Sequence, residues 1–382
     1  METIKVPINA IWDVDLKKKV LERIYYAVPG LADVVFQSEG LTLKVTEAAQ
    51  VDLAGVGIYV QDLIKNTKKV KPKVLEQATV DPTFVENPFE ALKAQYEVFE
   101  THDGSFVLSG NFLRRMTIID TLIRQHAATI GADEMAVPTL LATKSLVANG
   151  YLHDFPHHAL FAAPVKHDLR ALQAVADIRQ VSSEDFYQFN DYLGAPDQIL
   201  APTVCYHCFE AFRDRQFDKP EVLITALGQC HRFESKNLKD LRRLKHFRMR
   251  ELVYFGDEAS VQRRLNASVD WILEIMRNWN VQFRLVTAND PFFLAESDRK
   301  SAYQTAFHLK RELQLYLPFA DQWLAVGSFN HHQSVLAEKY GFKLQNVEKS
   351  QSGCIGFGFE RFTYALYCQF GFLPTAWPVA LK

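Results

Sequence analysis

Residues 228–256 read GQCHRFESKNLKDLRRLKHFRMRELVYFG, a pattern that predicts a strand, a long basic loop and a second strand. Arg232 and Glu234 occupy alternate positions of the first strand, so both side chains point to one face. In the second half of the segment, five cations flank one aromatic residue, Phe247: Arg242, Arg243, Lys245, Arg248 and Arg250. An ATP site needs such parts, because guanidinium groups bind phosphates and an aromatic face binds adenine. By itself, the segment predicts either such a site or a charged surface hairpin.

A second segment, SGCIGFGFERFTYALY at residues 352–367, is rich in glycine and leads into an apolar helix. Gly356 and Gly358 permit close approach of a ligand to the backbone. Arg361 lies at the start of the helix, where the N-terminus already favours phosphate. The segment is not a Walker loop, since no Gly-Lys-Ser/Thr follows the glycines.

The cysteines are odd in number and confined to the C-terminal half, so they do not predict a disulfide framework: Cys205, Cys208, Cys230, Cys354 and Cys368. Cys205, Glu251 and Cys354 all fall near apparent strand ends. Two thiolates and one carboxylate can supply three zinc ligands and leave a fourth position open, as catalytic sites do. Two interpretations compete with this one. The Cys205–Cys208 spacing could hold a metal with distant ligands, or the cysteines could be buried and inert.

The order of the segments predicts an α+β protein. Residues 1–80 combine strands, a hairpin and two helices, which predicts a small N-terminal α+β domain without an assigned role. Residues 81–104 are the expected linker. From 105 to 382, short β-rich runs alternate with amphipathic helices and short loops. This pattern favours a mostly antiparallel sheet flanked by helices.

Composition and charge restrict the class of protein. With 48% hydrophobic and 23% charged residues, the 382-residue chain has a typical globular composition. The formal net charge of −2 disfavours a large tRNA-binding surface, because affinity for tRNA comes mainly from Lys and Arg on phosphates. No apolar run reaches the ~18 residues of a membrane span, and the N-terminus lacks a secretory signal pattern. We therefore expect a cytoplasmic protein that contacts no membrane.

Together these segments resemble the three motifs of class II aminoacyl-tRNA synthetases. RFE, a basic loop and RLKHF are similar to motif 2, and GFGFER is similar to motif 3. GADEMAVPTLLATKSLVANGYL resembles motif 1, with Pro138 at the dimer-interface position, which implies a homodimer. From about residue 105 to 375 the chain resembles the amino acid:[carrier protein] ligases. These are homologues of the atypical zinc-dependent seryl-tRNA synthetase of methanogens that lack its tRNA-binding domain. The segments that carry this likeness are LSGNFLRRM, GYLHDFP, APTVCYHC, RLKHFRMREL, ANDPFF, SFNHH and CIGFGFERF.

The resemblance implies a role for each candidate residue. Cys205, Glu251 and Cys354 would hold the zinc that binds the amino group of the substrate. Arg232 and Arg361 would be catalytic, with Arg232 on the α-phosphate and Arg361 on the γ-phosphate or the base. The other expected ATP-binding residues are Glu234, Arg243, Phe247, Gly356 and Gly358, of which Glu234 would lie near adenine and Phe247 would stack on it. Asn289, Asp290, Ser328 and Asn330 would line the substrate pocket. His331 is a departure, since the family usually has tyrosine there.

The function implied by the resemblance is a two-step ligase reaction. ATP, with Mg²⁺, activates a small amino acid to an aminoacyl adenylate. The aminoacyl group then passes to the phosphopantetheine thiol of a carrier protein, and no tRNA takes part. Two alternatives stay open at this point: an atypical seryl-tRNA synthetase-like enzyme that charges tRNA, and a catalytically inactive, synthetase-derived binding subunit.

Overall fold

The computed structural model describes residues 1–66, 72–178, 185–235, 238, 240–290, 292–293, 304 and 307–382. Its main element is an eight-stranded sheet with the order β4-β13-β14-β15-β16-β12-β11-β7. All neighbours pair antiparallel except β11 and β7, which are parallel. The strands are β4 Val74–Ala78, β7 Asp133–Ala136, β11 Val222–His231, β12 His246–Gly256, β13 Phe283–Thr287, β14 Lys310–Leu317, β15 Gln322–Gln333 and β16 Gln351–Gly358. The prediction of a mostly antiparallel sheet flanked by helices is therefore confirmed.

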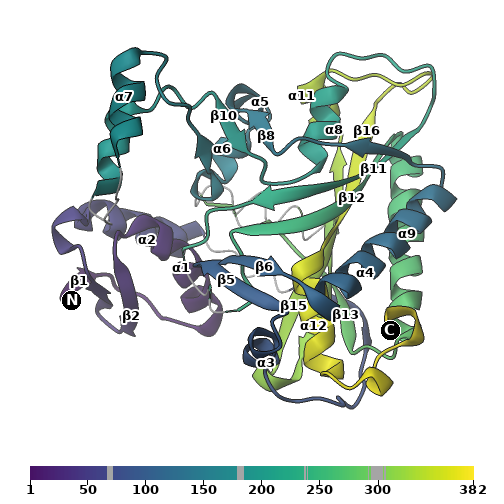
Figure 1. Ribbon diagram of the computed structural model, residues 1–382, viewed down its shortest axis with the longest axis horizontal. Helices are drawn as coiled ribbons and strands as arrows, with labels where there is room; N and C mark the ends of the chain where they lie inside the picture. Colours follow the sequence, from purple (N-terminus) through teal and green to yellow (C-terminus); the bar gives the residue numbers. More distant parts are fainter. Residues whose placement is uncertain are drawn as a thin grey trace.

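Helices cover both faces of this sheet (Figure 1). Alternate residues of β12 enter different cores: Leu252 and Tyr254 pack on one side, Val253 and Phe255 on the other. The first side is covered by α4 Gly110–Thr129, α9 Glu258–Asn278 and α12 Phe359–Phe370. The second is covered by α8 Cys205–Ala211 and α11 Val335–Tyr340. The second half of β12, LVYFG, is therefore buried on both faces, and its sequence is correspondingly apolar.

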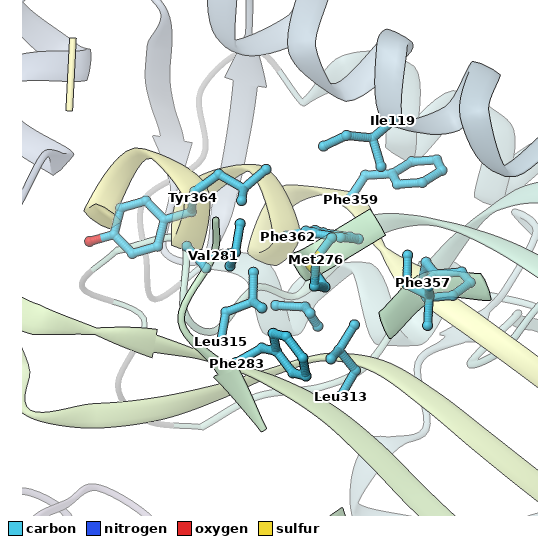
Figure 2. Close-up of a cluster of buried hydrophobic side chains, with 14 of the residues drawn as sticks. Ile119, Met276, Val281, Phe283, Leu313, Leu315, Phe357, Phe359, Phe362 and Tyr364 are labelled. Atoms are coloured by element: carbon cyan, nitrogen blue, oxygen red, sulfur yellow. The ribbon is translucent and has the colours of Figure 1, made fainter. Parts of the chain in front are cut away.

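The larger core fills the space between the sheet and α4, α9 and α12. Figure 2 shows Ile119, Met276 and Phe362 from the three helices gathered with Phe283 and Leu313 of the sheet. In α12, residues on every side of the helix are buried, because it runs between the sheet and α4. This packing holds the first turn of α12, and with it Arg361, in place.

A Phe362→Ala substitution is expected to lower the free energy of unfolding by about 3–5 kcal/mol, because it removes a buried aromatic ring and leaves a cavity. Phe362 is 1% exposed, within the core described above. Denaturant unfolding followed by circular dichroism measures the loss. The matched control is Leu373→Ala at a 71% exposed position, where a change within about 0.5 kcal/mol is expected. Equal losses in the two variants would contradict this description of the core.

The N-terminal residues form a separate small sheet with the order β1-β3-β2. Its strands are β1 Glu2–Pro7, β2 Leu31–Gln37 and β3 Gly40–Val45, and they pack on α1 Val14–Ala27 and α2 Leu53–Asn66. The turn between β2 and β3 is followed by Gly40 (φ 151°), the first residue of β3, where a side chain would collide with Val6 O. In Figure 1 these elements lie together at one end of the molecule, away from the C-terminus. We call residues 1–66 the N-terminal unit.

The predicted division of the chain into residues 1–80, a linker at 81–104 and residues 105–382 stays a prediction. Strand β4 lies within residues 1–80, yet it pairs with β13 at the edge of the large sheet. The expected linker, 81–104, contains α3 Phe89–Ala94 and β5 Val98–His102, and β5 forms a hairpin with β6 Ser105–Leu108. The remaining elements are β8 Leu140–Ala142, α5 Thr143–Ala148, α6 Tyr151–Asp154, β9 Phe161–Ala162, α7 Leu169–Asp177 and β10 Gln198–Leu200. Among the described residues, no helix is both long and apolar enough to cross a membrane.

Candidate functional site

Three residues far apart in the sequence meet where β12, β16 and α8 come together. Cys205 is the first residue of α8, Glu251 lies on β12, and Cys354 lies on β16. Because β12 and β16 are neighbouring strands, Glu251 and Cys354 are brought together by the sheet itself. One ligand atom from each of the three lies within 4.8 Å of the others, and all three residues are buried. We call these residues the triad.

The triad fits a divalent metal. Glu251 Oε1 accepts hydrogen bonds from Thr203 Oγ1 at 2.5 Å and from the amide of Val204 at 2.9 Å. Oε2 is buried and has no hydrogen-bond partner among the described residues. Burial, followed by the neighbouring Cys354 thiol, raises the pKa of Glu251 to about 7. A buried carboxylate next to two thiols is stabilised when a cation binds, and two sulfur ligands with one oxygen suit Zn²⁺.

A second layer of hydrogen bonds holds Cys354. Its Sγ lies 3.4 Å from His332 Nε2, and Asn330 Nδ2 donates to it at 3.6 Å. The other nitrogen of His332, Nδ1, is 3.1 Å from Ser352 Oγ, which fixes the orientation of the ring. The contact with Cys205, followed by His332, holds the pKa of the Cys354 thiol below its usual value. Such contacts orient metal ligands and stabilise their ionised form.

The remaining cysteines do not join this group. Cys208, Cys230 and Cys368 are each 0% exposed. Burial raises the pKa of Cys208 to about 12 and also raises that of Cys230, which disfavours the thiolate form that binds a metal. Among the described residues, the triad is the group able to hold a metal, and the alternative built on the Cys205–Cys208 spacing is not supported.

The arginines of the two sequence motifs come together beside the triad. The prediction that Arg232 and Glu234 lie on the first strand is wrong, because β11 ends at His231 and both residues follow it. Arg232 Nε donates to the carbonyl of Pro202 at 3.1 Å. Arg361 lies in the first turn of α12. Burial lowers the pKa of Arg361 to about 10, with Arg243 and Arg232 lowering it further and Glu234 opposing them. We call Arg232, Arg243 and Arg361 the arginine cluster, which suits an anion such as a polyphosphate.

Glu234 and Phe247 lie within the same group. Glu234 is 7% exposed, and its Oε2 accepts a hydrogen bond from Arg243 Nη1 at 2.6 Å. The guanidinium of Arg232 lies over the ring of Phe247, 5.2 Å from its centre. The hairpin β11–β12 and its loop thus bring these arginines, the acid and the aromatic ring together, and their binding of a nucleotide stays a prediction.

Gly356 and Gly358, the two glycines expected to bind ATP, have different surroundings. A side chain at Gly356 would come within 2.8 Å of Met249 Sδ and 3.5 Å of Glu251 Cγ, so this glycine lets β16 pack tightly against β12. At Gly358, the residue before α12, a side chain would meet none of the described residues within 4 Å. Open space beside the backbone at a helix N-terminus leaves room for a ligand there.

Of the four predicted pocket residues, Asp290 follows β13, and Ser328 and Asn330 lie on β15, two strands away in the sheet. Asp290 forms an ion pair with Lys310 of β14 at 2.5 Å, and that cation lowers the pKa of Asp290 despite its burial. On β15, Asn330 Nδ2 donates to Ser328 Oγ at 3.3 Å and also reaches Cys354 of the triad. Asn289 is exposed, and its place in a pocket stays a prediction.

Sequence reasoning missed two residues of this group, Lys310 and His332. Lys310 is 9% exposed and lies between Asp290 and Glu312, with its nitrogen 3.7 Å from the latter. The HLKRELQLYL sequence around it reads as an ordinary amphipathic strand. His332 lies next to His331 in the sequence, and only the pairing of β15 with β16 shows that His332 is the one that reaches Cys354.

The chain is similar to several known proteins. Residues 187–369 match the model of the tRNA synthetase class II core domain (G, H, P, S and T). Amino acid–[acyl-carrier-protein] ligase 1 of Bradyrhizobium diazoefficiens is 26% identical over 275 residues, which is 70% of this chain and 82% of that protein. The type-2 serine–tRNA ligase of Methanopyrus kandleri is 25% identical over 68% of this chain, and the match spans about half (52%) of that relative's length.

Among solved structures, the seryl-tRNA synthetase of M. kandleri, crystallised with A. aeolicus tRNASec, matches with a TM-score of 0.74. The match covers 99% of this chain and 76% of that one at 19% sequence identity, so it shows the fold. Residues 187–369 therefore carry the class II tRNA synthetase core domain, and the chain is similar to amino acid–[acyl-carrier-protein] ligases and to type-2 serine–tRNA ligases of methanogens.

Proposed function

We propose that this protein activates a small amino acid with ATP and transfers it, through an aminoacyl adenylate, to the phosphopantetheine thiol of a carrier protein. The observation that carries the proposal is the meeting of the metal-fitting triad with the arginine cluster. Arg232 joins the two groups, because its Nε donates to the carbonyl of Pro202 at 3.1 Å and the next residue, Thr203, donates to Glu251 of the triad at 2.5 Å. A substrate amine held at the triad would then have its carboxylate next to the guanidinium that meets the α-phosphate.

In the first step, the carboxylate of the amino acid attacks the α-phosphorus of ATP and pyrophosphate leaves. The reaction needs no protein nucleophile, because alignment and neutralisation of charge supply most of the acceleration. Arg232 would hold the α-phosphate and the attacking carboxylate, and Arg243 and Arg361 would hold the outer phosphates together with Mg²⁺. Phe247 would pack against the adenine ring.

The triad would serve substrate recognition. Bound by Cys205, Glu251 and Cys354, Zn²⁺ would supply a Lewis-acidic position for an unprotonated amine. His332 and Asn330 would keep the Cys354 thiolate oriented. Asp290, Ser328 and Asn330 would line the space for the amino-acid side chain, and the Lys310 ion pair would keep Asp290 ionised.

In the second step, the phosphopantetheine thiol attacks the adenylate carbonyl, a thioester forms and AMP leaves. Two observations support the carrier as acceptor: the match that covers 82% of an amino acid–[acyl-carrier-protein] ligase, and the net charge of −2. A tRNA acceptor is the second candidate, and the specific observation in its favour is the fold match over 99% of the chain to a synthetase crystallised with tRNA. Both acceptors require the same adenylate.

We also propose that the protein is a homodimer. Pro138, the proline of the segment that resembles motif 1, lies between β7 and β8 at the edge of the large sheet. Light scattering on the purified protein tests this, and a monomer at micromolar concentration would overturn it.

ATP–pyrophosphate exchange with a panel of amino acids, in the presence of Zn²⁺ and Mg²⁺, tests the activation step. Exchange is expected with one or two small amino acids, at least about 10³-fold faster than in their absence, because amino-acid activation is a large catalysed effect. No exchange with any amino acid would contradict the proposal and would favour the inactive, synthetase-derived binding subunit.

The acceptor is decided separately. With the amino acid that supports exchange, mass spectrometry of holo carrier proteins is expected to show an aminoacyl thioester that hydroxylamine cleaves. Acid-stable charging of tRNA with no acylated carrier would show instead that the protein is a seryl-tRNA synthetase-like enzyme. The apo carrier, which lacks the thiol, is the control for the first assay.

A further inference from the structure

The N-terminal unit contacts the site through Tyr26. The contact is on the nucleotide side, by which we mean the arginine cluster with Glu234 and Phe247. Tyr26 lies in the last turn of α1, and its hydroxyl donates a hydrogen bond to Glu234 Oε2 at 2.9 Å. The same oxygen accepts the hydrogen bond from Arg243 at 2.6 Å. A helix that carries no recognisable motif thus supplies a direct partner to a residue of motif 2.

The surroundings of Tyr26 hold its ring in place. The ring packs edge-on against His157 at 4.8 Å and against Phe233 at 6.2 Å between ring centres. Burial, followed by the Glu234 carboxylate, raises the pKa of Tyr26 above its usual value, so the phenol keeps its proton and stays a hydrogen-bond donor. The position and the protonation state of this donor are therefore both determined.

A second contact fixes the N-terminal unit from α2. Tyr59 stacks on Phe293 with 5.2 Å between the ring centres, and its hydroxyl donates to the carbonyl of Phe293 at 3.0 Å. Phe293 belongs to the segment that follows Asp290, one of the residues proposed to line the space for the amino acid. In the described part of the chain, the Tyr26 hydroxyl therefore bonds to Glu234, whereas the Tyr59 hydroxyl bonds to the segment after Asp290.

The contacts of Glu234 leave one oxygen for a ligand. Among the described residues, both hydrogen bonds to this carboxylate end on Oε2, from Tyr26 and from Arg243. Held at one oxygen from two directions, the buried carboxylate cannot rotate without losing both bonds. Its Oε1 is thereby preorganised as an acceptor, which lowers the entropy cost of binding a donor.

We propose that Tyr26 is a positioning residue of the nucleotide site, which fixes Glu234 so that Oε1 accepts a hydrogen bond from the exocyclic amine of adenine. The inference rests on the proposed function, because it takes Glu234 as the residue that meets the base. It gives the N-terminal unit a part in nucleotide recognition. It also implies base selectivity, since guanine presents a carbonyl oxygen where adenine presents the amine, and two acceptors repel each other.

The test compares Tyr26→Phe with Tyr59→Phe, because each variant removes one hydroxyl that bonds the N-terminal unit to the catalytic part. Tyr26→Phe is expected to weaken ATP binding about tenfold, the effect of one lost hydrogen bond to a charged group. Its preference for ATP over GTP is expected to fall, while kcat of exchange and the KM for the amino acid stay within about twofold. Tyr59→Phe is expected to leave ATP binding and base preference unchanged, with a melting temperature equal to that of Tyr26→Phe.

A double-mutant cycle with Glu234→Gln completes the test, with ATP binding measured by calorimetry in the absence of amino acid. In the Glu234→Gln background, Tyr26→Phe is expected to change ATP affinity by less than twofold, since the group that Tyr26 positions has already been altered. Additive effects, or equal effects of Tyr26→Phe and Tyr59→Phe, would overturn the assignment.

Direct binding also separates this inference from the proposed function. A wild-type protein that binds ATP but catalyses no exchange would contradict the proposed function, and the binding cycle would still decide the role of Tyr26. A wild-type protein that binds no ATP would overturn both.

Discussion

A Cys354→Ala variant is expected to lose both its bound metal and its activity. The wild type is expected to contain about one zinc ion per chain, because the triad offers three ligands and leaves one position for substrate. With one ligand removed, zinc content should fall to near zero and exchange should fall at least about 10³-fold, roughly 4 kcal/mol of transition-state stabilisation. Elemental analysis of the purified protein and the exchange assay measure the two losses.

The matched control for this variant is Cys208→Ala. Cys208 is also a buried cysteine, three residues after Cys205, but it lies outside the triad. This control is expected to keep its zinc and its exchange activity. Melting temperatures measured with and without a chelator add a second readout, since a bound metal stabilises the folded state and its removal should lower the wild-type value. A Cys354→Ala protein that melts cooperatively and still holds zinc would contradict the assignment of the triad.

An Arg232→Ala variant is expected to lose at least about 10³-fold in kcat/KM for exchange, because a preorganised guanidinium at the reacting phosphate stabilises the charge that develops there. Arg232→Lys should recover only part of this loss, since an ammonium group has the charge but not the planar pair of donors. Zinc content should be the same in both variants and in the wild type, because Arg232 is not a ligand of the triad.

Arg263→Ala is the control for the loss of a positive charge. Arg263 lies on α9, its side chain is 63% exposed, and it pairs with Glu221 away from the site. Exchange by this variant is expected to stay within twofold of the wild type, because an exposed ion pair contributes little. An Arg232→Ala protein that keeps more than a tenth of the wild-type kcat/KM would show that another cation holds the α-phosphate.

The hairpin and the glycine-rich strand were predictable because their signals are local. In residues 228–256, the β-rich ends and the charged middle predict two strands joined by a loop, and β11 and β12 pair in that way. In residues 352–367, an apolar run with glycines precedes a helical pattern, and β16 leads directly into α12. Alternation along a strand and periodicity along a helix depend on residues a few positions apart, so a sequence displays them.

Which strands lie beside these elements in the sheet was not predictable from local patterns. Strand order depends on which apolar faces pack together, and no local pattern states that β16 lies between β15 and β12. The pairing of β4 with β13 shows the same limit, because a strand within residues 1–80 pairs with a strand about two hundred positions later. Such contacts are decided by the burial of the whole core.

The sequence by itself determined the chemical groups of this protein: two thiols and a carboxylate that could hold zinc, and the arginines and aromatic ring that could hold ATP. It identified them through local motifs and through a resemblance to a family. Only the tertiary structure decided which groups meet. The pairing of β12 with β16 brings Glu251 to Cys354, and the docking of α1 brings Tyr26 to Glu234. The physical reason is that side-chain chemistry belongs to a residue, whereas proximity comes from long-range packing, which no segment contains alone.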